Sequence, residues 1–263
     1  MSPTIGVFDS GFGGLTVLRE LLKTVPEADY LYFGDTARLP YGSKSAHTVA
    51  KYAISSAHFL EQRGAGLLVI ACNTATALAL EDIKAASSLP VIGVVEPGAQ
   101  RAAEISRTKK AAVIATEATV ASHAYQKALA RRGITATEKA CPLLVPLVEE
   151  GWAEHAVTEQ VAHIYLDEIF GNGAQGADVL LLGCTHYPLI RPLLRRVAPA
   201  EIQIVDSAES TAQEVAKQIE RGNPGKNGQV HCFATDSVEK FRRLGSRFLG
   251  RPLENVELID IEA

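Results

Sequence analysis

Two of the four cysteines in this chain stand in matching surroundings. Cys72 and Cys184 each follow an apolar run of strand length, and each precedes two polar residues, Asn73-Thr74 in one case and Thr185-His186 in the other. A lone cysteine at the end of a buried strand usually serves as a small apolar residue. The recurrence of the whole arrangement favours a chemical role for both thiols over a structural one.

The chemistry that needs two such thiols is the inversion of a stereocentre. A cysteine protease pairs one thiol with a histidine, and a thiol redox enzyme brings two thiols into contact. Inversion instead requires an acid on one side of a carbon and a base on the other, and the two groups exchange roles with the direction of reaction. We therefore interpret Cys72 and Cys184 as an opposed acid–base pair. Cys141 and Cys232 lack polar neighbours of this kind, and we interpret them as structural.

A glycine-rich segment near the start of the chain is a second candidate. Residues 9–16 (Asp-Ser-Gly-Phe-Gly-Gly-Leu-Thr) join an apolar run to an amphipathic one. Backbone N–H groups at such a turn can bind an anion. The segment is not a dinucleotide-binding fingerprint, because the third glycine of that pattern would fall at Thr16. We expect it to bind a carboxylate of a small ligand. Nucleotide binding, with Asp35 placed to contact a ribose, is the weaker alternative.

A polar loop at residues 34–42 is the third candidate. It follows the next apolar run and contains Pro40 and Gly42, two residues that shape turns. Its exposed N–H groups could bind a carboxylate. Taken alone, such a loop is more often only a surface connection between two elements.

Short apolar runs alternate with longer amphipathic stretches along the chain, a pattern typical of a parallel sheet with crossover helices. We expect strands at residues 5–8, 30–33, 67–71, 91–95, 112–115, 179–182, 202–205 and 230–235. We expect helices at residues 14–24, 46–63, 75–86, 98–105, 122–132, 156–170, 188–197, 210–221 and 238–244. Residues 222–225 (Gly-Asn-Pro-Gly) are predicted to form a loop.

The strands also indicate an internal repeat. Residues 67–74 align with residues 179–186, and in the same order 7–10 align with 114–116 and 91–96 with 202–206. Two related α/β halves follow from this pattern. Ligands of open parallel sheets bind beyond the carboxyl ends of the strands, where the two cysteines lie. If the sheets face each other, Cys72 and Cys184 approach one pocket from opposite sides.

Taken together, the motifs resemble those of the glutamate racemases, within the aspartate/glutamate racemase superfamily. The most specific are Ala-Cys-Asn-Thr-Ala around Cys72 and Leu-Gly-Cys-Thr-His-Tyr-Pro-Leu around Cys184. The matching stretches are residues 6–18, 34–42, 71–75, 116–122, 142–151, 182–189 and 205–208.

The resemblance implies an α/β fold of two similar domains, with mainly parallel sheets flanked by helices and the active site at the domain interface. It implies that the C-terminal segment returns to the first domain. The first domain would then be discontinuous, comprising residues 1–96 plus 209–263, and the second would comprise residues 97–208.

The resemblance also implies cofactor-independent racemisation of L- and D-glutamate without a metal, which supplies D-glutamate for bacterial peptidoglycan. Cys72 and Cys184 would be the catalytic acids and bases, with Asp9 assisting Cys72, His186 assisting Cys184, and Glu149 as a further helper. Asp9 and His186 would also contact the substrate. The other positions matched to substrate binding are Ser10, Pro40, Tyr41, Gly42, Asn73, Thr74, Thr116, Thr119 and Thr185. Glutamate is the implied small-molecule partner, and a homodimer is expected.

Composition narrows the remaining classes of function. The 263 residues are 47% hydrophobic and 21% charged, with a formal net charge of −4, which is typical of a globular protein and unlike one that grips nucleic acid. No signal peptide and no apolar run of the roughly 20 residues that a membrane helix needs is visible. We therefore expect a cytoplasmic protein with reduced thiols and with neither nucleic-acid nor membrane partners.

Three alternatives stay open on the sequence. An aspartate racemase or related isomerase would keep both cysteines and differ in pocket depth. A two-lobed amino acid-binding protein of the periplasmic type would share the architecture but lack catalysis, and a nucleotide-dependent dehydrogenase would use the glycine-rich segment. Some relatives that need a cell-wall precursor as activator carry an N-terminal extension, which is not seen here, so we expect no such requirement.

Overall fold

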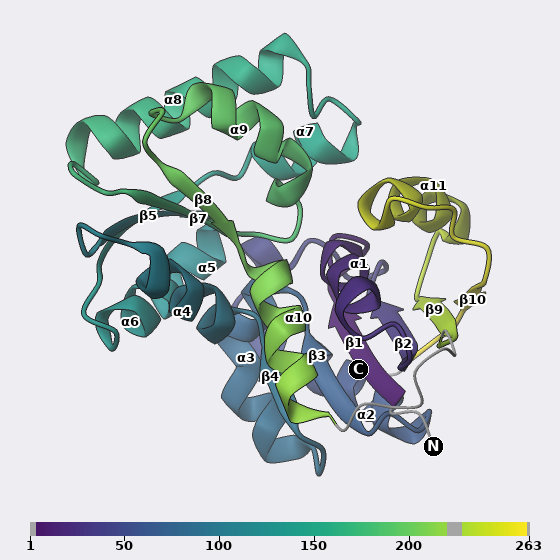
Figure 1. Cartoon of the computed structure of the whole chain (residues 1–263). Helices are drawn as coiled ribbons and strands as arrows, with labels where there is room; N and C mark the ends of the chain where they lie inside the picture. The colour runs from purple at the N-terminus through teal and green to yellow at the C-terminus, as the bar shows by residue number, and fades with distance from the viewer. Residues whose placement is uncertain (1–3, 220–227, 262–263) are drawn as a thin grey trace.

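The computed structural model describes residues 4–219 and 228–261 and contains two parallel sheets flanked by helices (Figure 1). The strands of the first sheet are β1 Thr4–Asp9, β2 Asp29–Gly34, β3 Leu67–Ile70, β4 Val91–Gly93, β9 Val230–Ala234 and β10 Val256–Leu258. Those of the second sheet are β5 Lys110–Ala115, β6 Thr135–Ala140, β7 Val179–Gly183 and β8 Gln203–Asp206. Every strand pairing within these residues is parallel, so the predicted fold class is confirmed. The predicted loop at 222–225 lies outside the described residues.

Helices connect successive strands on both faces of the sheets. In the first half of the chain they are α1 Leu15–Thr24, the 3₁₀ turn η1 Tyr41–Ser43, α2 Ala46–Gln62, α3 Asn73–Ala86 and α4 Val95–Ile105. They continue with α5 Glu117–Ser122, α6 Ala124–Ala130, α7 Leu144–Glu149, α8 Ala156–Asn172, the 3₁₀ turn η2 Tyr187–Ile190, α9 Arg191–Val197, α10 Ser207–Gln218 and α11 Val238–Leu249.

The two sheets share one strand order. The first sheet contains β2-β1-β3-β4 as neighbours, and the second contains β6-β5-β7-β8. The repeat predicted from strand ends therefore agrees with the topology, with β1 equivalent to β5 and β3 to β7. In this order the connections leave β1 and β3 toward opposite edges, and a ligand crevice is expected beyond the carboxyl ends of those two strands. The same holds for β5 and β7.

The central strands are apolar because helices cover both of their faces. All four residues of β3 are buried, and successive side chains point to opposite faces. Leu68 and Ile70 pack in one cluster with residues of α2, whereas Leu67 and Val69 pack in another with residues of α1. Such burial of both faces explains the continuous apolar run that marked this strand in the sequence.

The chain passes from one sheet to the other twice, through α4 after β4 and at the junction of β8 and α10. Helix α10 packs against both α1 and α4. All strands of the first sheet come from residues 4–93 and 230–258, and all strands of the second come from residues 110–206. The domain boundaries predicted at 96/97 and 208/209 fit this arrangement and remain a prediction.

Several predicted elements need correction. Strands β6 and β10 and helix α7 were not predicted, because β6 (Thr-Ala-Thr-Glu-Lys-Ala) is a half-polar edge strand and β10 and α7 are short. Val95 lies in α4 and not in a strand. The helix expected at 122–132 corresponds to α6, which begins at Ala124, and the preceding helix α5 was not predicted; His123, in a left-handed conformation with φ of 55°, separates the two. Helix α3 begins at Asn73 and not at Ala75.

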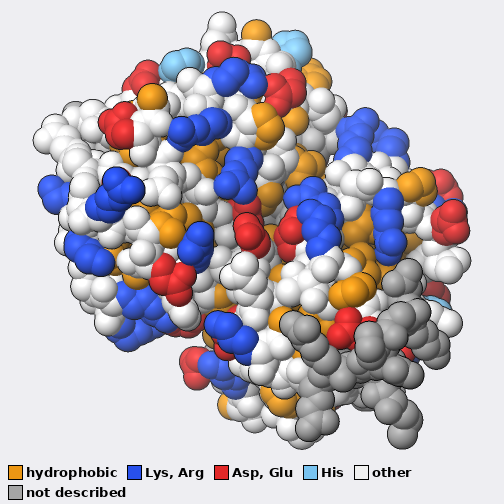
Figure 2. Space-filling model, viewed as in Figure 1, with side chains coloured by type: hydrophobic (Ala, Val, Ile, Leu, Met, Phe, Trp, Pro, Cys, Tyr) orange, Lys and Arg blue, Asp and Glu red, His pale blue; other side chains and the backbone are white. Residues whose placement is uncertain are grey.

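The surface shows basic and acidic side chains interspersed, with apolar side chains between them, on the face seen in Figure 2. Among the described residues, this face shows no large patch of basic side chains of the kind that binds a phosphate backbone. Among residues 4–219 and 228–261, no helix combines the length and the apolar character needed to cross a membrane.

Candidate active site

A cavity of about 190 Å³ lies at the carboxyl ends of the central strands of both sheets. This is smaller than the roughly 300–1,000 Å³ of sites for drug-sized ligands, so it suits a small metabolite. All five side chains predicted to act in catalysis line it, as do all the predicted substrate-contacting residues except Thr119. The lining residues are Asp9, Ser10, Gly11, Phe12, Leu39, Pro40, Tyr41, Gly42, Ser43, Cys72, Asn73, Thr74, Thr116, Glu117, Pro142, Val145, Pro146, Glu149, Cys184, Thr185 and His186.

Cys72 lies between β3 and the N-terminus of α3. Its Sγ accepts a hydrogen bond from the Ala75 N–H at 3.4 Å, so the thiol caps the helix, a position where Ser, Thr, Asp or Asn is the usual residue. The same sulfur donates to Ser10 Oγ at 3.6 Å. Burial, with the nearby Asp9 carboxylate as a second cause, raises the pKa of the Cys72 thiol to about 12. The resting group is therefore a protonated thiol, ready to act as an acid.

Asp9 is a buried carboxyl group at the end of β1. Its Oδ2 accepts a hydrogen bond from the Gly11 N–H at 2.9 Å, whereas its Oδ1 is buried without a partner in the described structure. Burial raises the pKa of Asp9, although the charge of His186 and three backbone N–H groups oppose that rise. Gly14 is required here, because a Cβ at that position would lie 2.6 Å from the Cβ of Asp9. The free oxygen is available to a cationic or protonated group of a ligand.

Cys184 lies at the end of β7 beside an ion pair. Its Sγ is 3.9 Å from Nδ1 of His186, and Nε2 of His186 is 3.2 Å from Oε1 of Glu149. Burial alone would lower the pKa of His186, but its contacts with Cys184 and Glu149 outweigh burial and raise the pKa to about 10. The imidazole is therefore a cation at neutral pH. A cation in this position can stabilise negative charge on the sulfur.

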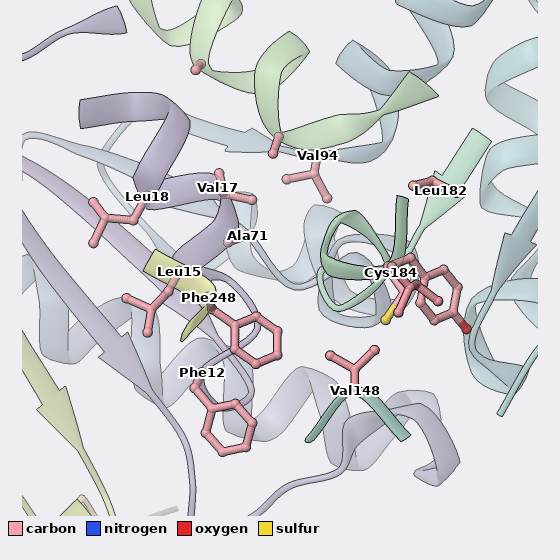
Figure 3. Packing of buried hydrophobic residues seen from close by; sticks show 14 of the residues in the cluster. Phe12, Leu15, Val17, Leu18, Ala71, Val94, Val148, Leu182, Cys184 and Phe248 are labelled. Atoms are coloured by element: carbon pink, nitrogen blue, oxygen red, sulfur yellow. The ribbon is translucent and has the colours of Figure 1, made fainter. Parts of the chain in front are cut away.

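Two aromatic rings fix the position of this imidazole. The ring centroid of Phe248 is 4.9 Å from that of His186 in an edge-on arrangement, and the ring centroid of Phe12 is 6.1 Å away. Phe12 and Phe248 also pack on each other, with their ring centroids 5.7 Å apart (Figure 3). The two rings therefore place apolar surface against the imidazole.

Three hydroxyl groups meet where the two halves touch. Thr74 Oγ1 lies 2.9 Å from Thr116 Oγ1 and 3.3 Å from Thr119 Oγ1, and the last two lie 2.9 Å apart. Thr119 is fully buried and does not reach the cavity, so it supports the other two hydroxyls from behind. The cluster lies at the N-terminus of α3, whose helix dipole favours an anion. These hydroxyls can rotate to donate to a carboxylate.

The loop at residues 34–42 is fixed by a buried acid. The hydroxyl of Tyr41 donates to Asp35 Oδ2 at 2.6 Å, and the hydroxyl of Thr235 donates to Asp35 Oδ1 at 3.0 Å. Arg38 adds an ion pair with Asp35 at 3.6 Å. Asp35 is fully buried and does not line the cavity, so it is not placed to contact a ribose. This observation removes the main support for nucleotide binding.

The other two cysteines do not line the cavity. Cys141, which precedes the lining residue Pro142, and Cys232 are both buried and are free thiols like Cys72 and Cys184. Burial raises the pKa of Cys232 to about 12. In the part of the chain that the structure describes, no cluster of three or more His, Cys, Asp or Glu side chains could hold a metal ion.

Sequence reasoning missed three contacts that support residues of the site. The contact of Ser10 with Cys72 and the packing of Phe248 on His186 were not predicted, and neither was a buried tyrosine, Tyr125, whose hydroxyl donates to Asn73. The first could have been found from the neighbouring strand ends. The others join elements far apart in sequence, and no local pattern marks them.

The chain matches known proteins over nearly its whole length. A sequence profile of the Asp/Glu/hydantoin racemases matches residues 5–215. The glutamate racemase of Koribacter versatilis is 60% identical over 98% of both chains, and that of Geobacter metallireducens is 47% identical over 98% of this chain and 97% of the relative. Among solved structures, glutamate racemase isoform RacE1 from Bacillus anthracis superposes with a TM-score of 0.92, at 35% identity over 98% of this chain and 97% of the other. The Francisella tularensis glutamate racemase in complex with D-glutamate gives 0.90, at 33% identity over 98% of both chains.

Proposed function

Because the chain belongs to the Asp/Glu/hydantoin racemase family and is an amino acid isomerase of the glutamate racemase type, we propose that it interconverts L- and D-glutamate through Cys72 and Cys184. One observation carries the mechanism. The two thiols follow equivalent strands of two similar sheets and line the same cavity. The Francisella relative, solved with D-glutamate, supports the choice of substrate.

The proposed reaction is a transfer of two protons. One cysteine, as a thiolate, removes the proton from Cα and becomes a thiol. The other, as a thiol, delivers its proton to the opposite side of the same carbon and becomes a thiolate. The carbon is inverted, charge is conserved, and the roles reverse for the other enantiomer.

The surrounding residues stabilise the negative charge that develops at Cα. We infer that the hydroxyls of Thr74 and Thr116 and the N-terminus of α3 bind the α-carboxylate and stabilise the charge delocalised on it, whereas the amide of Asn73 holds that carboxylate equally before and during proton transfer. The unpartnered Oδ1 of Asp9 is free to bind the ammonium group. The Cα proton of an amino acid is only weakly acidic, so the proposed step depends on this electrostatic stabilisation.

The decisive experiment is proton exchange in heavy water. The protein is incubated in D₂O with L-glutamate and, separately, with D-glutamate, and deuterium at Cα and the enantiomer ratio are both measured. We expect inversion accompanied by deuterium incorporation from either side. A protein that binds glutamate without exchange would be a binding protein, and this outcome would overturn the proposal.

The nearest alternative is a racemase for aspartate, which the same two cysteines could serve. The solved aspartate racemase of Picrophilus torridus is only 16% identical, with a TM-score of 0.60, so it shows the shared fold alone. A panel of both enantiomers of glutamate and aspartate separates the two activities. We expect preference for glutamate.

We further propose that the product D-glutamate is destined for peptidoglycan and that the protein is a homodimer. The family resemblance supports both statements. Complementation of a bacterium that requires added D-glutamate checks the first. Light scattering of the purified protein checks the second.

A further inference from the structure

Tyr125 connects the two halves of the molecule directly behind the cavity. It lies in α6, in the half built on the second sheet, and is fully buried. Its hydroxyl donates to Oδ1 of Asn73 at 2.5 Å. Asn73 is the first residue of α3, in the half built on the first sheet, and follows Cys72. Asn73 lines the cavity and Tyr125 does not.

The contact decides which way the carboxamide of Asn73 faces. Its Nδ2 is buried and has no partner among the described residues. A buried donor without a partner is costly, so this NH₂ group is expected to find its acceptor on a ligand. A flip of the amide would exchange its donor and acceptor atoms. As a donor, the hydroxyl of Tyr125 favours the orientation in which Oδ1 of Asn73 faces Tyr125.

Ser207 is the neighbour that favours Tyr125 as a donor. Burial raises the pKa of the Tyr125 phenol, and the side chain of Ser207, as a hydrogen-bond donor near the phenol oxygen, opposes that rise. When Ser207 donates to that oxygen, the proton of Tyr125 is left for Asn73. The chain of donors then runs from Ser207 through Tyr125 to the oxygen of Asn73, and we expect the NH₂ group of this cavity-lining residue to end the chain on a bound ligand.

The ring of Tyr125 is also held by both passages of the chain between the sheets. Ser207 begins α10, the second passage, and Gly98 lies in α4, the first. A Cβ at Gly98 would be 3.2 Å from Cβ of Ser207 and 3.6 Å from the ring of Tyr125. On another side, a Cβ at Gly183, the residue before Cys184, would be 2.9 Å from the ring. Tyr125 therefore contacts the chain segments that set the positions of the two halves.

We propose that Tyr125 is a positioning residue, whose hydroxyl orients the Asn73 amide toward the carboxylate of the substrate and ties that orientation to the packing of the two halves. The inference rests on the proposed function only in taking the ligand to be an amino acid. A group that binds the carboxylate equally in the ground state and in the transition state changes KM and leaves kcat nearly unaltered.

The test is Tyr125→Phe, which removes one oxygen and keeps the ring. We expect KM for both glutamate enantiomers to rise about tenfold, the size of one buried hydrogen bond, while kcat changes less than about threefold. The matched control is Tyr30→Phe. Tyr30 is also fully buried, and its hydroxyl donates to the carbonyls of Leu21 and Val25, away from the cavity. The control variant should keep the KM of the unmodified protein, and thermal melting shows whether both variants are folded.

A double-mutant cycle separates positioning from general packing. Asn73→Ala is made alone and together with Tyr125→Phe, and D-glutamate affinity is measured by calorimetry alongside KM. If Tyr125 acts through Asn73, its substitution changes neither quantity more than about twofold in the Asn73→Ala background. An equal effect in both backgrounds, or a Tyr125→Phe variant that behaves like Tyr30→Phe, would overturn the inference. If the unmodified protein neither binds nor racemises glutamate, it is the proposed function that fails.

Discussion

Cys72 and Cys184, each with its neighbouring side chains, form what we call the two half-sites. These occupy equivalent places in two similar sheets, yet their electrostatic surroundings differ. Cys72 caps a helix next to a buried carboxyl group, and its pKa is raised to about 12. Cys184 lies beside an imidazole that Glu149 helps to keep cationic. The two thiols therefore have equivalent positions in the repeat, but an acid lies beside one and a cation beside the other. We infer that proton removal from the two enantiomers is tuned separately.

The asymmetry arises at two aligned positions. Asp9 ends β1, whereas the equivalent strand β5 ends at Ala115, so the second half has no acid at that place. His186 is the second residue after Cys184, whereas Thr74 is the second residue after Cys72. Two changes in a duplicated framework therefore suffice to give one thiol a neighbouring acid and the other a neighbouring cation.

Each half-site also depends on residues from the opposite half. Thr16 of α1 donates to the carbonyl of Thr185 at 3.0 Å, and Phe248 of α11 packs on His186. In return, Tyr125 of α6 holds Asn73, and Thr116 contacts Thr74. Neither thiol has its complete surroundings unless both halves are in place.

The largest expected effect comes from replacing the thiol that each half-site contains. Cys72→Ser and Cys184→Ser should each reduce racemisation by about 10²- to 10⁴-fold, the range attributed to a positioned acid or base. Steady-state rates with each enantiomer measure the loss. Cys232→Ala, which alters a buried thiol away from the cavity, is the control and should retain activity. A double variant, Cys72→Ser with Cys184→Ser, that still racemises at the normal rate would refute the proposed two-cysteine mechanism.

The next effect isolates the Cys72 half-site. Asp9→Asn removes the acid in an almost isosteric change, and we expect kcat to fall about 10²-fold. The pKa of Asp9 is raised by burial, so its ionisation at neutral pH destabilises the folded state relative to the unfolded one. The variant should therefore melt at a higher temperature at pH 7, with little difference below pH 4. Calorimetric melting at the two pH values checks this, and a variant less stable at pH 7 would contradict it.

A substitution in the Cys184 half-site should change how activity and stability depend on pH. Glu149→Gln removes one of the contacts that raise the pKa of His186 to about 10, so this pKa should fall toward its ordinary value of 6.5. A raised histidine pKa adds stability below pH 6.5 that is lost as pH rises through about 10. We expect both activity and stability of the variant to decline at lower pH than in the unmodified protein. Profiles of kcat and of the free energy of unfolding against pH measure the shift.

Asp9→Asn and Glu149→Gln should also differ in how they change the kcat values for the two enantiomers. Because the equilibrium constant between enantiomers is one, kcat/KM must stay equal in the two directions for any variant. The individual kcat values are free to differ. We expect Asp9→Asn and Glu149→Gln to shift the ratio of the two kcat values in opposite senses, and equal shifts would mean that the half-sites are not tuned separately.

The smallest expected effect comes from the packing of Phe248 on the ring of His186. Phe248→Leu shortens a buried side chain, and we expect it to lower the free energy of unfolding by about 1–1.5 kcal/mol. The ring of His186 gains freedom, so kcat should fall only about threefold, since one packing contact is lost while the ion pair remains. Urea titration and steady-state kinetics measure the two quantities. Phe241→Leu, at a buried residue of the same helix that does not contact His186, provides the comparison.

Sequence reasoning predicted the parts of the site that lie at the ends of strongly apolar strands. Cys72 and Cys184 could be placed in one pocket because β3 and β7 are continuous apolar runs and ligands bind beyond such strands. Strand β6 was missed because its edge position tolerates Thr, Glu and Lys, which erase the apolar signal. The start of α3 was misplaced because a thiol acts as its cap.

The contacts that sequence could not predict are those between distant elements. Tyr125 is one of several tyrosines in an amphipathic helix pattern, and nothing local distinguishes a hydroxyl that reaches a residue 52 positions away. Phe248 lies in a helix that is remote in sequence from His186. Such contacts depend on how the two sheets are joined, which the order of apolar runs leaves open.

The return of the C-terminal segment to the first sheet has a consequence for biosynthesis. Strand β2 pairs with β9, about 200 residues later in the chain, whereas all four strands of the second sheet lie within residues 110–206. During translation the second sheet can be completed first, while the apolar edge of β2 (Asp-Tyr-Leu-Tyr-Phe-Gly) waits for its partner. An unpaired edge of this kind is a template for wrong association. The last strands, β9 and the short β10 with Glu257 at its centre, cover this edge. We expect the pairing of β9 with β2 to end the period in which the nascent chain exposes an edge prone to wrong association.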